Sequence, residues 1–184
     1  MTKLIILDRD GVINEDSDAY VKSVEEWIPL PGSIEAIARL SQAGYQIAIA
    51  TNQSGLGRGY FQPADLEAMH NKLLSLLSGA GGELAGIFFC PHAPEDNCQC
   101  RKPLPGLVDD IEQTLGVSVI DAPIVGDSLR DLEAGVARGC KPILVRTGKG
   151  EKSEAKLKAH SDPRISNAPV FDDLAAVADY LLAN

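Results

Sequence analysis

The sequence predicts an α/β fold built on a doubly wound parallel sheet. Segments with strand character alternate along the chain with segments that carry apolar residues at helical spacing, and right-handed crossovers turn that alternation into a sheet with helices on both faces. The first strand, residues 4–7, is too short for a helix and apolar at every position, as expected at the centre of a parallel sheet. Polar clusters follow four strands, at the edge where such sheets bind ligands.

The composition is that of one globular domain covering residues 1–184. Of the 184 residues, 45% are hydrophobic and 23% are charged, and the net charge is −9, which is enough apolar material for a well-filled core. The chain has no long basic run, which argues against nucleic acid and anionic membranes as partners. Neither a signal-peptide pattern nor an apolar stretch of membrane-spanning length occurs, so we expect a cytoplasmic protein.

In the first part of the chain, residues 14–31 are predicted to form a polar flap outside the core. A helix is expected to begin at Ser33, with this residue as its N-cap, and to stop at Gly44. A strand over residues 45–50 follows and leads into residues 51–59, whose small side chains let the backbone amides approach an anion. The same loop also fits an ordinary strand-to-helix connection.

The rest of the chain continues the alternation. The predicted elements are a helix from residue 63 to the glycines at 79–82, strands at 87–89, 124–125 and 142–145, helices at 105–116 and 131–138, an edge strand at 170–171 and a helix from 174. Residues 148–163, rich in Lys, Glu and Gly, are interpreted as a solvated excursion. His70 is interpreted as a packing or surface residue, and Cys140 as a small buried one.

Four polar side chains are expected on one edge of the sheet, because each follows a strand: Asp8, Thr51, Lys102 and Asp127. In proteins Mg²⁺ is held by one or two carboxylates together with water and phosphate oxygens, and Asp8 and Asp127 meet that requirement. The ammonium of Lys102 and the hydroxyl of Thr51 are suited to neutralising a phosphoryl group. The edge therefore has the chemistry of a magnesium-dependent phosphoryl-transfer site.

The stretch Asp8-Arg9-Asp10-Gly11 carries the predicted reaction. Asp8 is placed as an in-line carboxylate nucleophile and Asp10 as the general acid and base, with an aspartyl phosphate as the intermediate. Taken alone, the stretch fits equally well an Asx-type turn made permissive by Gly11. A calcium loop is disfavoured because the glycine comes too early and no bidentate Glu follows at the required distance.

In this order, Asp8-Arg9-Asp10-Gly11, Thr51, Lys102 and Gly126-Asp127 resemble the motifs of the haloacid dehalogenase superfamily of phosphatases, and the resemblance covers nearly the whole chain. More narrowly, residues 51–61 and 90–103 look like the D-glycero-D-manno-heptose 1,7-bisphosphate 7-phosphatase family, and the related histidinol-phosphate phosphatase domain shares much of the pattern. The resemblance implies a Rossmann-like domain without a large cap. It also implies Mg²⁺-dependent removal of the 7-phosphate from a phosphorylated sugar, in the synthesis of nucleotide-activated heptose for lipopolysaccharide or other surface glycans.

The resemblance further implies a role for each matching residue. Asp8 matches the nucleophile, Asp10 the acid and base that also gives the metal its backbone carbonyl, and Asp127 the remaining carboxylate ligand. Thr51 and Lys102 match the phosphate-binding pair, and the positions lining the substrate are matched by Asn52, Ser54, Arg58 and Arg101. Asp131 is left with three roles open: to orient Lys102, to orient a metal-bound water, or to begin a helix as a favourable charge.

Three of the four cysteines fall within residues 90–100, which favours a metal site over a disulfide framework. Cys90, His92, Cys98 and Cys100 offer three thiolates and one imidazole, a donor set suited to tetrahedral Zn²⁺. All four positions are filled by protein, so the site is expected to be structural, a small zinc-binding loop that holds the following Arg-Lys pair towards the phosphate. The alternative is a polar loop that carries reduced cysteines.

Other functions also fit the sequence. Histidinol phosphate, or another small sugar or nucleotide phosphate, is the alternative substrate, although a histidinol-phosphate phosphatase is expected to carry an acidic residue in place of Ser54. The non-enzymatic alternative is a zinc-stabilised binding protein that has lost catalysis, and the intact set of catalytic residue types argues against it. We expect a monomer.

Overall fold

The computed structural model describes residues 3–184. Within them, six strands form one parallel sheet in the order β3-β2-β1-β4-β5-β6. The strands are β1 (Lys3–Leu7), β2 (Tyr45–Asn52), β3 (Gly86–Cys90), β4 (Pro123–Gly126), β5 (Lys141–Val145) and β6 (Val170–Phe171). The strand order reverses direction between β1 and β4, so the ends of these two strands form the crevice in which open α/β sheets bind ligands.

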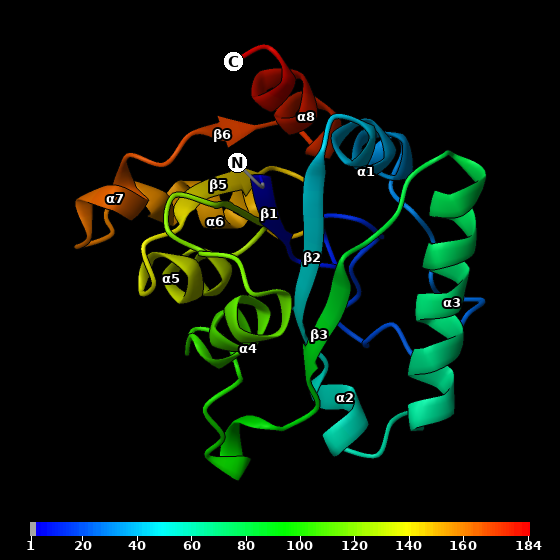
Figure 1. Ribbon diagram of the computed structural model, residues 1–184. Helices are drawn as coiled ribbons and strands as arrows, with labels where there is room; N and C mark the ends of the chain where they lie inside the picture. Colours follow the sequence, from blue (N-terminus) through cyan, green and yellow to red (C-terminus); the bar gives the residue numbers. More distant parts are fainter. Residues whose placement is uncertain (1–2) are drawn as a thin grey trace.

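Helices cover both faces of the sheet (Figure 1). They are α1 (Ser33–Gln42), α2 (Ser54–Gly57), α3 (Pro63–Gly79), η1 (Pro94–Asp96), α4 (Gly106–Leu115), α5 (Leu129–Val136), α6 (Gly150–Leu157), α7 (Pro163–Ser166) and α8 (Leu174–Leu182). Side chains of α1, α3 and α8 form the core on one face, and those of α4 and α5 on the other. The predicted doubly wound α/β fold is confirmed. None of the helices described for residues 3–184 is long and apolar enough to cross a membrane.

The central strand is buried on both sides, as its apolar sequence predicts. Ile5 and Leu7 belong to the core under α1, α3 and α8, whereas Leu4 and Ile6 belong to the core under α4. Burying one such side chain stabilises the fold by about 1.5–3 kcal/mol. The end of β1, where the first acidic residue stands, is therefore held rigidly from both faces.

Residues 14–31 are not a flap outside the core, and that expectation was wrong. Trp27 is fully buried and Val21 is 5% exposed, and both pack into the core under α1 and α3. The amide of Glu15 donates to the carbonyl of Ile28 at 2.8 Å, which closes the segment into a loop. The apolar anchors are spaced irregularly between charged residues, so no strand or helix period marks them as core.

The predicted N-cap of α1 is also wrong. The capping position is taken by Gly32, whose φ is 80°, and Ser33 is the first helical residue. The Ser33 hydroxyl donates instead to the carbonyl of Val12 at 2.9 Å, which ties the helix to the loop after β1. A glycine tolerates this left-handed conformation without the strain that a side chain would bring.

Residues 148–163 are not a solvated excursion but contain α6. Leu157 from this helix packs with Ile165 of α7 against Leu144 of β5, and the charged side chains take the outer face. The Ser153 hydroxyl donates to the backbone carbonyl of Asp127 at 2.7 Å. The charged residues of α6 led to the wrong interpretation as a solvated excursion, and this helix supports the end of β4.

Candidate active site

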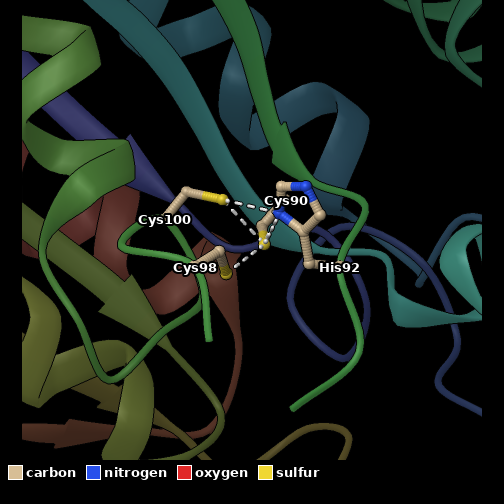
Figure 2. Close-up of side chains that lie close together, drawn as sticks. All are labelled: Cys90, His92, Cys98 and Cys100. Atoms are coloured by element: carbon tan, nitrogen blue, oxygen red, sulfur yellow. Dashed lines mark hydrogen bonds between the residues drawn. The ribbon is translucent and has the colours of Figure 1, made fainter. Parts of the chain in front are cut away.

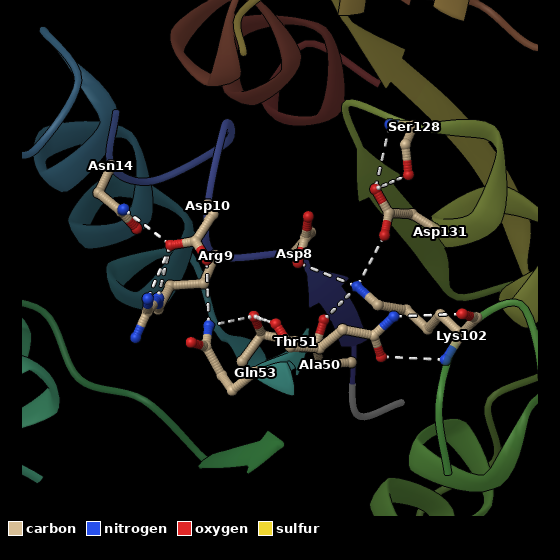
Figure 3. Close-up of polar contacts among 11 residues, drawn as sticks. Asp8, Arg9, Asp10, Asn14, Ala50, Thr51, Gln53, Lys102, Ser128 and Asp131 are labelled. Carbon is tan, nitrogen blue, oxygen red and sulfur yellow. Dashed lines mark hydrogen bonds and ion pairs between the residues drawn. The ribbon is translucent and has the colours of Figure 1, made fainter. Parts of the chain in front are cut away.

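Asp8 follows β1 and meets a lysine from a distant part of the chain (Figure 3). The Lys102 Nζ atom lies 2.9 Å from Asp8 Oδ1 and 2.7 Å from Asp131 Oδ1, and it donates to the carbonyl of Ala50 at 2.8 Å. The Lys102 side chain is 3% exposed and that of Asp131 is 5% exposed. The three donors of the ammonium are thus used by one backbone oxygen and two carboxylates, which fixes the charge beside Asp8.

Asp131 combines two of the roles left open for it. Its Oδ2 accepts hydrogen bonds from the backbone amide and the hydroxyl of Ser128, each at 3.1 Å, so it caps the start of α5. Its other oxygen orients Lys102. Burial acts to raise the pKa of Asp131, but the charge of Lys102 and the Ser128 hydrogen bonds hold that pKa below its usual range.

Burial and mutual repulsion raise the pKa of the other two carboxyls. Desolvation, followed by the charge of Asp131, raises the pKa of Asp8 to about 7 despite Lys102. Desolvation, followed by the charge of Asp8, raises the pKa of Asp127 to about 9. In the same cluster, burial opposes the positive charge of Lys102, but Asp131 and Asp8 raise the pKa of this lysine above its ordinary value.

Asp127 follows β4 and is held by the loop before α6. The backbone amide of Lys149 donates to Asp127 Oδ2 at 2.9 Å. A Cβ atom at Gly148 or at Gly11 would collide with the Asp127 carboxylate, so both positions require glycine. Carboxylate oxygens of Asp8, Asp127 and Asp131 lie within 4.8 Å of one another, the arrangement expected of a site that gathers carboxylates around a cation.

Asp10 is linked to the loop after β2 through a residue that the sequence did not single out. The Gln53 side-chain amide donates to Asp10 Oδ2 at 3.1 Å and to Thr51 Oγ1 at 2.9 Å (Figure 3). Gln53 is 4% exposed and Thr51 is 1% exposed. Gln53 lies inside the small-residue loop, but a glutamine among polar neighbours carries no signal that it will turn inward.

These side chains line a cavity of about 90 Å³. Of the predicted residues it contains Asp8, Asp10, Thr51, Asn52, Lys102 and Asp127, and it adds Asp16, Ser128, Arg130, Asp131 and Lys149. Three predicted substrate-lining residues, Ser54, Arg58 and Arg101, are not among its walls. Arg101 lines an adjoining cavity of about 480 Å³, which shares Lys102 and Arg130 with the first.

Two of the predicted substrate residues, Asn52 and Arg58, have structural partners. Asn52 holds the backbone of Lys102 through two hydrogen bonds, of 3.1 Å to its carbonyl and 3.0 Å from its amide. Arg58 lies 3.8 Å from Glu95, and Ser54 is 9% exposed at the start of α2. Asn52 therefore locks the lysine loop onto the end of β2, whatever else it contacts.

The four predicted zinc ligands come together at the end of β3 (Figure 2). Their ligand atoms all lie within 4.8 Å of one another. Cys90 Sγ is 3.6 Å from both His92 Nδ1 and Cys98 Sγ, and His92 Nδ1 is 3.4 Å from Cys100 Sγ. The Sγ atoms of Cys90 and Cys100 are 2.9 Å apart. Zn–S bonds of about 2.3 Å place the sulfurs of a tetrahedral site about 3.8 Å apart, so the Cys90–Cys98 spacing fits such an ion and the Cys90–Cys100 pair is closer than the ion requires.

The fold and the carboxyl-edge side chains define the class of protein. Two family models match the chain: one described as polynucleotide kinase 3 phosphatase over residues 3–132, and one described as HAD-hydrolase-like over residues 99–177. The chain is a phosphatase of the haloacid dehalogenase superfamily.

Relatives of known name narrow the family. The D-glycero-β-D-manno-heptose-1,7-bisphosphate 7-phosphatase of Pseudomonas aeruginosa is 55% identical over 97% of both chains, and the enzyme of the same name from Bordetella bronchiseptica is 54% identical over 98% of both. A crystal structure of D,D-heptose 1,7-bisphosphate phosphatase from B. bronchiseptica, complexed with magnesium and phosphate, matches with a TM-score of 0.92, 54% identity and 98% coverage of each chain. A further match, from Burkholderia thailandensis, has 43% identity, a TM-score of 0.76 and 99% coverage of each chain. The chain belongs to the D-glycero-β-D-manno-heptose-1,7-bisphosphate 7-phosphatase family.

Proposed function

We propose that the protein removes the 7-phosphate of D-glycero-β-D-manno-heptose 1,7-bisphosphate in the synthesis of nucleotide-activated heptose for surface glycans. The observation that carries the proposal is the Asp8–Lys102–Asp131 cluster beside Asp127, with Asp10 lining the same cavity. The relatives that match almost end to end carry the name of this activity. Their name also specifies the β-anomer, which the sequence alone left open.

A magnesium ion fits the residues at the carboxyl edge. Asp8 and Asp127 offer oxygens to a hard cation, and the raised pKa values of their carboxyls reflect buried negative charge that a cation would offset. The backbone carbonyl of Asp10 is the proposed third protein ligand. When bound, Mg²⁺ would draw charge from the phosphoryl oxygens and so make phosphorus more open to attack.

In the first step, a carboxylate oxygen of Asp8 attacks phosphorus while the bond from phosphorus to the sugar oxygen breaks. Lys102 and the Thr51 hydroxyl lie at the cavity wall beside Asp8, where the charge of the lysine and the dipole of the hydroxyl stabilise the transferring group. Asp10 gives its proton to the departing sugar oxygen. The products of this step are the sugar with a free hydroxyl group and the phosphorylated Asp8.

In the second step, water attacks the phosphorus of the aspartyl phosphate and Asp10 takes the proton of that water. The bond between Asp8 and phosphorus breaks, so the Asp8 carboxylate and the protonated Asp10 are restored. The sum of the two steps is one phosphate ester and one water converted to an alcohol and inorganic phosphate. One carboxylic acid therefore serves as acid and base in turn.

The substrate beyond the reacting phosphate is assigned to Asn52, Ser54, Arg58 and Arg101. Support is clearest for Arg101, whose Nη1 atom is buried without a hydrogen-bond partner within residues 3–184 and whose side chain lines the cavity next to the catalytic one. A sugar hydroxyl or a second phosphate would satisfy that donor. Arg130 stands on the rim shared by the two cavities.

A structural zinc ion is proposed for Cys90, His92, Cys98 and Cys100. The spacing of their ligand atoms and the thiolate-rich donor set support it. Arg101 and Lys102 follow Cys100 directly, so the metal would order the segment that delivers both cations. We also propose that residues 1–184 act as a single domain, as a monomer, in the cytoplasm.

Phosphate release tests the proposal. The protein is assayed with Mg²⁺ and with EDTA on the α- and β-anomers of the heptose bisphosphate, on histidinol phosphate and on fructose 1,6-bisphosphate. We expect Mg²⁺-dependent release with kcat/KM highest for the β-anomer. Activity on histidinol phosphate alone would show that the protein is a histidinol-phosphate phosphatase. No release from any substrate would favour the zinc-stabilised binding protein.

A further inference from the structure

Arg9, between the two catalytic aspartates, is a fully buried cation. Its Nε and Nη2 atoms donate to Asp10 Oδ1 at 2.9 and 2.7 Å (Figure 3). Its Nη1 atom lies 3.1 Å from Nε2 of His70, a residue of α3. A buried guanidinium requires such partners, and here they connect the catalytic carboxylate to a helix on the face of the sheet.

The two oxygens of Asp10 are treated differently by the protein. Oδ1 receives three donors, the two from Arg9 and the Asn14 side-chain amide at 2.9 Å. Among residues 3–184, Oδ2 receives only the Gln53 amide at 3.1 Å. The Asp10 side chain is 22% exposed and lines the catalytic cavity. Oδ1 has no lone pair to spare, so Oδ2 is the oxygen with capacity for a proton.

His70 fixes the other end of this arrangement. A guanidinium N–H can only donate, so His70 Nε2 accepts, and the ring is neutral with its proton on Nδ1. Burial, followed by the charge of Arg9, lowers the pKa of His70 to about 4, which keeps the acceptor available at neutral pH. The ring also packs on Phe89, with centroids 6.2 Å apart.

We propose that His70 and Arg9 are positioning residues for proton transfer: His70 holds the guanidinium, the guanidinium holds Oδ1 of Asp10, and Oδ2 alone exchanges the proton with the sugar oxygen and with water. The inference rests on the proposed function, because it assigns the atom that performs the acid and base steps. Without the acceptor on α3, the Arg9 guanidinium can leave its position. The Asp10 carboxylate can then rotate about χ2, a torsion whose energy profile is broad and roughly two-fold. The acid would then be misplaced in part of the molecules.

A comparison of leaving groups separates this role from general support of the fold. A sugar alkoxide must be protonated as it leaves, whereas p-nitrophenolate leaves without a proton, and kcat/KM reports the steps up to phosphoryl transfer. His70→Leu removes the acceptor, and His70→Gln supplies a carbonyl oxygen in its place. We expect His70→Leu to lower kcat/KM for the heptose bisphosphate about 10-fold and to leave that for p-nitrophenyl phosphate within about 2-fold, with His70→Gln restoring most of the loss.

The matched control is His160→Leu, at a histidine that contacts Glu133 away from the cavity, and it should change neither value. An equal loss on both substrates, or a His70→Gln variant as impaired as His70→Leu, would overturn the proposal. Should His70→Leu fail to fold, Arg9→Lys is the second variant, because lysine retains the buried charge but cannot make the paired Nε and Nη2 hydrogen bonds to Asp10 Oδ1. It must then show the same selective loss on the sugar substrate.

The outcomes also distinguish this inference from the proposed function. A wild-type protein that ignores the heptose bisphosphate but hydrolyses fructose 1,6-bisphosphate or histidinol phosphate refutes the proposed substrate, and the leaving-group comparison is then made with that alkyl ester. A wild-type protein that hydrolyses only p-nitrophenyl phosphate would refute both.

Discussion

The carboxylate cluster at the end of β1 and the cysteine loop at the end of β3 both gather metal-binding side chains, but they are assembled in different ways. Asp8, Lys102 and the pair Asp127 and Asp131 come from three separate parts of the chain and are nearly buried. The four cysteine-loop ligands lie within residues 90–100, and His92 is exposed. The first site is held by the sheet and an internal lysine. The second is anchored at Cys90, which is fully buried at the end of β3, whereas most of the residues from His92 to Gln99 are exposed. Order in the second therefore depends on the metal far more than order in the first.

The largest effect is expected at the nucleophile. Asp8→Asn should reduce phosphate release by more than about 10³-fold, because an amide cannot form the phosphorylated intermediate. The fold should persist, since the variant removes charge repulsion from a buried cluster. Phosphate release and thermal unfolding are the measurements, with Asp109→Asn as a surface control. Retained activity in Asp8→Asn would refute the nucleophile assignment and the view that the carboxylate cluster is the catalytic site of the two.

Next comes the loss of the zinc ion. Cys98→Ser should lower the zinc content from about one ion per chain to nearly none, because a hydroxyl is a poor ligand for this ion. Activity should fall less than in the nucleophile variant, since only the placement of Arg101 and Lys102 is loosened. Elemental analysis and hydrogen exchange over residues 90–104 measure both effects. Cys140→Ala is the control, because that buried cysteine lies outside the loop. Stoichiometric zinc in Cys98→Ser would show that the four-ligand site is wrong.

A smaller effect isolates the role of burial. The Lys102–Asp131 and Arg138–Asp109 pairs have nearly the same separation, 2.7 and 2.6 Å, but only the first is buried. Asp131→Asn should destabilise the fold by about 3 kcal/mol, because it removes the charge of the closer of the two carboxylates that pair with the buried Lys102. Asp109→Asn should have no measurable effect, because exposed pairs contribute little. Equal unfolding midpoints for the two variants in urea would contradict the view that the carboxylate cluster holds itself together.

The last contrast is a pH dependence of opposite sign at the two sites. The folded-state pKa values of Asp8 and Asp127, about 7 and about 9, lie above the ordinary 3.8, so the folded protein binds more protons than the unfolded chain over that range. In EDTA the free energy of unfolding should therefore be greatest below about pH 4 as far as these groups contribute, and should fall as pH rises towards 9.

Mg²⁺ should remove much of that decline, because the ion replaces the protons. The zinc loop should behave in the opposite way, releasing its metal as the pH falls and its ligands become protonated. Urea unfolding at several pH values, with and without Mg²⁺, and zinc release followed by a chromophoric chelator measure the two trends. The contribution of Asp127 is the difference in the free energy of unfolding between the wild-type protein and Asp127→Asn. If that contribution rises between pH 6 and pH 9 in EDTA, the assignment of the raised pKa values is contradicted.

Sequence patterns located the parts of the site that follow strands. Asp8 and Asp127 each follow an apolar run, and parallel strands bring their carboxyl ends together, so local pattern was enough. Arg9 and His70 could not be paired in the same way, because 61 positions separate them and their contact depends on how α3 lies on the sheet. The inward turn of Gln53 depends likewise on Asp10, a partner from another strand end.

The failures in the fold have a common physical cause. Trp27 is buried although two glutamates precede it, and α6 has buried Leu157 as its one large apolar side chain. In both segments one or two anchors do the packing, which is too few to produce a period of 2 or 3.6 in the sequence. Long strands and the stripes of α3 and α8, with several inward residues each, were identified correctly.

The position of β1 has a consequence for how the protein is made. This strand is synthesised before the other five, and its residue Ile6 pairs with Ile124 of β4, so the chain must emerge from the ribosome at least as far as β4 before the sheet can close around it. The half made of β1, β2 and β3 can assemble earlier, with the edge of β1 still unpaired. Long-range pairing of this kind slows folding and leaves a strand edge exposed to other chains. A nascent chain truncated before β4 would therefore lack Asp127 and expose the unpaired apolar edge of β1, which is prone to aggregation.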